Sequence, residues 1–114
     1  MDGAELILLY DYYGALLTDR QRECFELRYD QDLSLGEIAQ ELGISRQGVH
    51  DNLSRTEQLL KNMEAKTGCV SRDRRCRLAA HQILALADKL DCTADPDLQN
   101  AVQSIRELAR ELEE

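Results

Sequence analysis

Residues 34–60 read SLGEIAQELGISRQGVHDNLSRTEQLL, and this stretch decides the fold. Ser34 followed by Glu37 is a capping box, which predicts that a short helix begins just after Ser34. Gly43 can adopt the left-handed conformation that ends a helix, and Ser45 can cap the helix that follows. Two helices joined by a tight glycine turn indicate a helix-turn-helix module over about residues 34–60.

The apolar side chains of this module have the spacing that such a fold requires. We expect the first helix to bury Ile38, Ala39 and Leu42, with the small Ala39 where the two helices cross. Ile44 would fill the space below the turn. From position 46 the second helix would bury Val49, Leu53, Leu60 and Met63, and it meets no breaker before Gly68, which predicts a length of about twenty residues.

Helical spacing continues on both sides of the module. Residues 5–17 predict a helix that buries six apolar side chains, and Thr18 with Gln21 is a capping box for a second helix to about residue 31. Residues 72–90 predict a fifth helix, preceded by a basic cluster, and Asp95 before Pro96 predicts the start of a sixth. The six side chains of the first helix are Leu6, Leu9, Tyr10, Tyr13, Leu16 and Leu17.

The predicted fold class is therefore all-α, a compact helical domain around a right-handed three-helix bundle of the winged-helix type. We expect a helix-turn-helix domain over residues 1–66 and a C-terminal helical extension over residues 67–114. The last helix carries a narrow apolar stripe from Leu98 to Leu112, in steps of three and four residues. Such a stripe needs a partner, which could be a helix of the same chain or a second copy in a homodimer.

Composition limits the function. The chain of 114 residues has a net charge of −8, which is unusual for a nucleic-acid-binding domain, but the acidic excess is greatest at the two ends. The four cysteines form no C-x-x-C pair, so we expect no metal site, no cofactor and reduced thiols in the cytoplasm. No apolar run approaches the roughly 18 residues of a membrane span. No catalytic motif is present, so an enzyme is the least favoured class.

The second helix of the module carries the candidate nucleic-acid contacts. Its exposed polar side chains could reach base edges and phosphates, and they are Ser45, Arg46, Gln47, His50, Asn52 and Arg55. Asp51 in the same row would repel phosphate. The alternative is a solvated helix face on which Arg46 and Arg55 pair with Asp51 and Glu57.

A second group of candidates is the basic cluster Arg72, Arg74, Arg75 and Arg77, the only concentrated positive charge in the sequence. It could hold a phosphate backbone or contact an acidic protein surface. Cys76 lies among these arginines, but no paired histidine or acid suggests chemistry there, and an inert half-buried thiol is the simpler interpretation.

Residues 8–60 resemble the YlxM family of small bacterial helix-turn-helix proteins. The similarity is most specific in DYYGALLTDRQR (11–22), DLSLGEIAQELGISRQGV (32–49) and DNLSRTE (51–57). The module also resembles region four of sigma factors, which reads promoters. The family resemblance implies a protein encoded beside the genes of the signal recognition particle and acting in, or regulating, that protein-targeting pathway.

Two functional hypotheses follow. In the first, the protein is a regulator that binds nucleic acid, either DNA or the RNA of the signal recognition particle. In the second, the scaffold is a protein-interaction module whose acidic ends bind the basic protein subunit of that particle. Fold alone does not decide between them.

Overall fold

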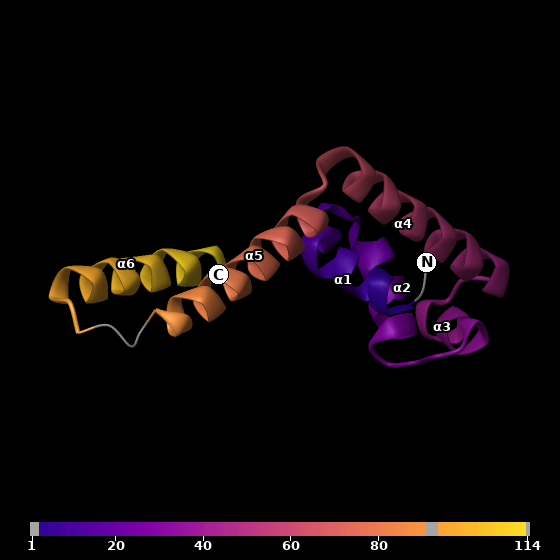
Figure 1. Ribbon diagram of the computed structural model, residues 1–114. Helices are drawn as coiled ribbons and strands as arrows, with labels where there is room; N and C mark the ends of the chain where they lie inside the picture. Colours follow the sequence, from indigo (N-terminus) through magenta and orange to yellow (C-terminus); the bar gives the residue numbers. More distant parts are fainter. Residues whose placement is uncertain (1–2, 91–93, 114) are drawn as a thin grey trace. The chain divides into compact units, whose positions relative to one another are not determined.

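The structure is a computed structural model that describes residues 3–90 and 94–113, and every regular element in those residues is helical (Figure 1). The all-α fold class is thus confirmed, and no strand forms a β-wing in the described ranges. The chain divides after Gly68 into two compact units, Met1–Gly68 and Cys69–Glu114.

The first unit contains four α-helices and one 3-10 turn. They are α1 (Gly3–Tyr13), η1 (Gly14–Leu16), α2 (Asp19–Tyr29), α3 (Leu35–Leu42) and α4 (Arg46–Thr67). Helix α4 has 22 residues, in agreement with the predicted length of about twenty, and it contacts α1, α2 and α3. The long helix therefore supports the whole unit, while its N-terminal half forms the second helix of the helix-turn-helix.

The predicted caps are present. Thr18 and Ser34 each form a complete capping box, with backbone N–H donors 3.2 and 3.1 Å from their hydroxyl oxygens. Gly43 lies in the left-handed region at φ 67°, and a Cβ added there would meet no atom within 4 Å. Glycine is required at this turn for its backbone conformation alone, since there is room for a side chain.

The core of the helix-turn-helix joins α2, α3 and α4. Cys24, Ile38 and Val49 are fully buried at its centre. The partly buried side chains packed around them include Ala39, Leu42, Ile44 and Leu53, as the apolar spacing predicts, together with Leu27, Leu33 and Leu35. This core fixes the roll of α4 about its axis and so determines which of its side chains point outward.

The long α4 is also held at its far end. The Tyr13 hydroxyl of α1 donates to Glu64 Oε1 at 3.0 Å and lies 2.6 Å from Thr67 Oγ1. Within α4 itself, the fully buried Thr56 donates its hydroxyl hydrogen to the backbone oxygen of Asn52 at 2.9 Å, so this buried polar group is satisfied.

The end of the first helix was predicted incorrectly. It stops at Tyr13 and continues as a 3-10 turn, in which Leu16 is 70% exposed instead of buried. Gly14 packs against the Tyr10 ring, and an added Cβ would lie 3.1 Å from it. The tighter turn lets the chain bury Leu17 directly before the cap at Thr18, which leaves Leu16 on the outer side.

The second unit is a hairpin of two helices, α5 (Cys69–Lys89) and α6 (Pro96–Glu113), which lie side by side (Figure 1). Helix α5 begins at Cys69, directly after the left-handed Gly68, so the basic cluster lies within the helix and does not precede it as predicted. The start of α6 is as predicted: Asp95 Oδ1 accepts the Asp97 backbone N–H at 2.9 Å.

Candidate nucleic-acid interface

The outward face of α4 begins with a cap that uses one of the predicted contact residues. The Ser45 side-chain oxygen accepts the backbone N–H of Gly48 at 2.9 Å. The capping bond uses the oxygen as an acceptor and leaves the hydroxyl hydrogen available to a phosphate. Ser45 thus has a structural role at the start of the helix and keeps one donor for a ligand.

Three exposed side chains form a polar group in the first turns of α4. Gln47 Nε2 donates to Asp51 Oδ1 at 2.9 Å, and His50 Nδ1 lies 3.6 Å from the same oxygen. The Asp51 carboxylate therefore holds the Gln47 amide, and His50 lies close to it without a hydrogen bond. Amide and carboxylate groups are the ones that pair with adenine and cytosine edges in the major groove, so this group has the chemistry of base readout.

The two arginines of α4 flank that group, and both are exposed. Glu57 pairs with Lys61 at 3.0 Å, and Asp51 contacts Gln47 and His50, so neither carboxylate neutralises an arginine. No hydrogen bond or ion pair of Arg46 or Arg55 is present in the described part of the chain. The alternative of a self-paired helix face therefore lacks the contacts that it requires, and both guanidinium groups are available to an anion.

Asn52 lies apart from the other predicted contacts. It is half-buried, and its backbone oxygen accepts the hydroxyl hydrogen of the buried Thr56. Four of the other five candidates are exposed on α4, from Arg46 to Arg55, and Ser45 is exposed at the cap directly before the helix. The structure therefore brings the predicted set together on one helix, with Asn52 at its inner edge.

Sequence reasoning missed a shallow apolar groove between α2 and α4 beside Arg55. It is lined by Gln21 of α2 and by Arg55, Gln58, Leu59 and Asn62 of α4. Leu59 is 39% exposed because it lies outside the buried stripe of its helix. The sequence signal that could have revealed this groove is Leu59, because its position does not fit the helical spacing of the buried residues of α4.

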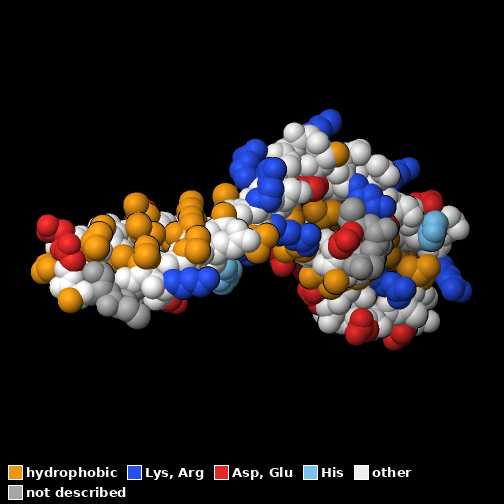
Figure 2. Space-filling view, in the orientation of Figure 1, with side chains coloured by type: hydrophobic (Ala, Val, Ile, Leu, Met, Phe, Trp, Pro, Cys, Tyr) orange, Lys and Arg blue, Asp and Glu red, His pale blue; other side chains and the backbone are white. Residues whose placement is uncertain are grey.

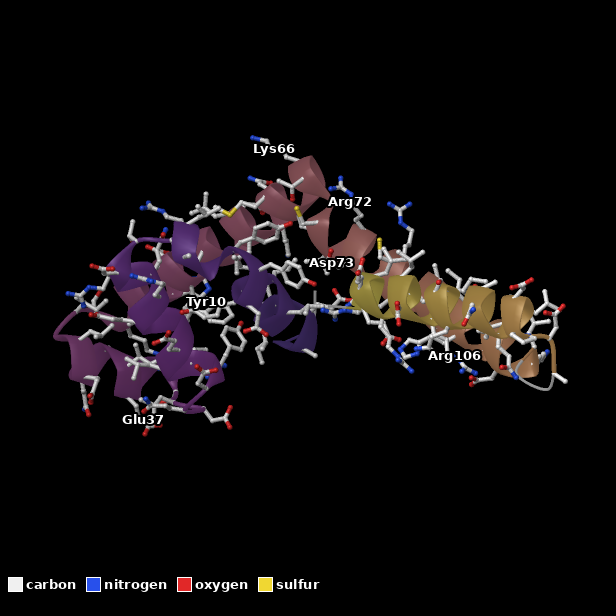
Figure 3. The ribbon with its side chains drawn as sticks, turned by 90° about the vertical axis from the view of Figure 1, so that its left-hand side faces the viewer. Tyr10, Glu37, Lys66, Arg72, Asp73 and Arg106 are labelled. Atoms are coloured by element: carbon white, nitrogen blue, oxygen red, sulfur yellow. The ribbon has the colours of Figure 1, made fainter. Side chains whose placement is uncertain are left out.

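The arginines of the basic cluster belong to the second unit. Arg72, Arg74 and Arg75 are all exposed on the N-terminal part of α5, and Arg72 is labelled in Figure 3. They form a positively charged segment of the second unit, whereas the α4 set belongs to the first unit. Cys76 within that segment is half-buried and free.

The first unit also has an acidic groove between α2 and α3. Carboxylates of Glu23, Glu26 and Glu41 line it together with Leu27 and Leu42. Glu26 also accepts a hydrogen bond from the hydroxyl of the half-buried Tyr10 at 2.6 Å, and Tyr10 is labelled in Figure 3. Burial and this hydrogen bond raise the pKa of Tyr10 to about 12.

No group of three or more metal-binding side chains occurs in residues 3–90 or 94–113. In the same ranges, no helix is long and apolar enough to cross a membrane. Cys24 and Cys76 are in no disulfide, and burial raises the pKa of Cys24.

The capped glycine turn, its core and the polar face of α4 define a helix-turn-helix protein. Residues 2–95 match the family model UPF0122, described as "Putative helix-turn-helix protein, YlxM / p13 like". The chain belongs to this family, which confirms the resemblance seen in the sequence.

Relatives carry the same family name. A UPF0122 protein of Thermoanaerobacter sp. strain X514 is 44% identical over 117 residues, covering 96% of this chain and 92% of its own. One of Caldanaerobacter subterraneus subsp. tengcongensis is 58% identical over 67 residues, or 59% of this chain and 57% of its own. One of Streptococcus gordonii is 53% identical over 58 residues, covering 51% and 53%.

Proposed function

We propose that the protein is a regulator that binds nucleic acid through the outward face of α4 and acts by binding, without a catalytic step. The observation that carries the proposal is the pair of exposed, unneutralised arginines, Arg46 and Arg55, on either side of the polar group of Gln47, His50 and Asp51. Arginines at the edges would hold phosphates, and the central group would contact bases.

We propose that this binding serves the signal recognition particle pathway, with either duplex DNA or the RNA of the particle as ligand. The proposal rests on the resemblance to the YlxM family, and it implies a cytoplasmic protein. A homodimer would fit it, because two copies bring two reading helices to one ligand. Arg72, Arg74 and Arg75 are candidates for additional phosphate contacts.

The test is a salt titration of binding to random duplex DNA and to the particle's RNA. Two phosphate contacts from α4 predict that log K falls with log salt at a slope of about −2 on duplex DNA. Arg46→Ala and Arg55→Ala should each reduce that slope by about 1 and weaken binding. Arg20→Ala removes an equal charge from the exposed part of α2 and serves as the matched control. Equal losses in all three variants would contradict readout by α4.

The acidic groove favours a second candidate, a module that binds the basic protein subunit of the particle. Glu23 and Glu41 lie on the two sides of the groove, and neither has the hydrogen bond to Tyr10 that Glu26 accepts. The variant Glu23→Gln with Glu41→Gln should weaken binding to the protein subunit without RNA, while RNA binding stays unchanged or improves. If the two substitutions leave binding to the RNA-free subunit unchanged, this groove is excluded as the binding site.

A further inference from the structure

The hairpin of α5 and α6 is closed by small side chains. Ala80 and Ala87 of α5 and Val102 and Ala109 of α6 are the buried side chains in the overlapping parts of the two helices, each at most 4% exposed. Two polar contacts along the edges show that the helices are antiparallel: Arg106 forms an ion pair with Asp88 at 2.9 Å, and His81 Nδ1 lies 3.3 Å from Glu113 Oε1. Small contact residues allow close approach, but they leave the larger apolar side chains outside the contact.

Those larger side chains form a second apolar face. Seven of them are 39–63% exposed, and Figure 2 shows hydrophobic side chains following one another along the hairpin. In α6 the apolar positions 98, 101, 105, 108 and 112 advance in alternating steps of three and four. In α5 the positions 79, 83, 86 and 90 do the same. Each helix thus carries a coiled-coil seam in addition to the contact that closes the hairpin.

The exposed face is large for a hairpin of this size. Its seven large side chains expose roughly 600–700 Å² between them, close to the about 800 Å² that each partner contributes to a standard protein interface. A patch of that size on a monomer marks an interaction site. The seven large exposed side chains are Leu78, Leu86, Leu90, Leu98, Ile105, Leu108 and Leu112.

The charges beside this face restrict how a second copy can pack. The contacts of Arg106 with Asp88 and of His81 with Glu113 place the end of α6 beside α5 near residue 80, so the four arginines at positions 72–77 precede the part of α5 that α6 covers. Within the covered part the charges of Asp88 and Lys89 cancel, whereas α6 has two Arg against four Asp or Glu, a net charge of −2. A second copy turned by a two-fold axis along the helices would pack each acidic α6 beside the neutral part of the partner's α5 and would keep the two acidic helices apart.

We propose that two copies of the chain dimerise through their hairpins and form an antiparallel four-helix bundle. The axis runs along the bundle, so that α5 packs beside the partner's α6 and the two acidic α6 helices lie diagonally apart. The alternative two-fold arrangement would place the two acidic α6 helices together. The leucine seams form the centre of the bundle, and the alanine contacts lie within each hairpin.

Sedimentation velocity of the full chain, supported by light scattering, tests the proposal. The wild type should be a dimer at micromolar concentration. Leu86→Glu and Leu108→Glu introduce a charge into each seam and should weaken dimerisation by roughly a hundredfold or more. Both side chains are exposed in the single chain, at 60% and 63%, so helix content by circular dichroism should be unchanged.

The matched control is Leu16→Glu, the same substitution at a leucine that is 70% exposed in the first unit. It should leave the dimer intact. If either hairpin variant loses helix content, Leu108→Gln offers a milder change with the same expected direction. The proposal is overturned if the wild type is still monomeric at 100-fold higher concentration. It is also overturned if Leu86→Glu and Leu108→Glu both remain dimers. Neither result bears on binding by α4, which the arginine variants test separately.

Discussion

Replacing Gly43 with alanine should destabilise the helix-turn-helix, whereas replacing Gly36 with alanine should stabilise it. Gly43 lies at φ 67° with no atom within 4 Å of an added Cβ, so the cost is purely conformational. An L-residue in this region costs about 1–2 kcal/mol, and alanine recovers about 0.4–1 kcal/mol through the unfolded chain. We therefore expect Gly43→Ala to lower the free energy of unfolding by about 1 kcal/mol.

Gly36 provides the matched control because it lies inside α3, where a Cβ would meet only Ser34 Oγ at 4.0 Å. Alanine in a helix interior should add roughly 0.5–1 kcal/mol, so the two variants should differ by roughly 1.5–2 kcal/mol. Urea unfolding followed by tyrosine fluorescence reports on the first unit alone, since all four tyrosines lie there and the chain has no tryptophan. With a slope near 1 kcal/mol per molar urea, the midpoints should separate by about 1.5–2 M. Equal midpoints would refute the argument that the turn requires a left-handed residue.

Three further predictions concern the same unit. Asp32 has a positive φ of 53°, so Asp32→Gly should stabilise the fold by up to about 1 kcal/mol, measured by the same urea unfolding. The raised pKa of Tyr10 means that its protonated form stabilises the fold at neutral pH, and that this stabilisation is lost as the pH rises from 10 through about 12. Tyr10→Phe should remove that part of the alkaline decline, and an unchanged pH profile would exclude Tyr10 as its source. Ser45→Ala deletes the acceptor for the Gly48 backbone N–H and should cost about 1 kcal/mol in unfolding, with Ser54→Ala as the exposed control in the same helix.

Much of the first unit was predictable because its signals are local. The capping boxes at Thr18 and Ser34 and the glycine turn at Gly43 act through neighbouring backbone atoms, so the sequence alone determines them. The buried positions of α3 and of the first half of α4 follow a simple helical period. The end of the first helix was not predictable in this way, because the exposure of Leu16 depends on how the chain enters α2.

The candidate site was predictable in its members but not in its contacts. The spacing placed Arg46, Gln47, His50 and Arg55 on an outward face, but Asp51 could equally have paired with an arginine. Its contacts with Gln47 and His50 depend on side-chain rotamers that no residue pattern specifies. The stripe of the last helix was likewise recognised, but its division into a buried alanine contact and an exposed leucine seam required the position of α5.

The acidic charge and the exposed hairpin face are connected. A protein with a net charge of −8 is repelled by phosphate at long range, and two free arginines on one helix offer little to overcome that repulsion. The proposed pairing of the hairpins would double the number of these helices without adding any cation to the chain. Once one module is bound, the second would bind at an effective concentration set by the connection, which can raise the overall affinity by about 10²–10⁴. Under this proposal, dimerisation would let a weakly cationic helix bind a repeated or two-fold ligand tightly while each single site still dissociates readily.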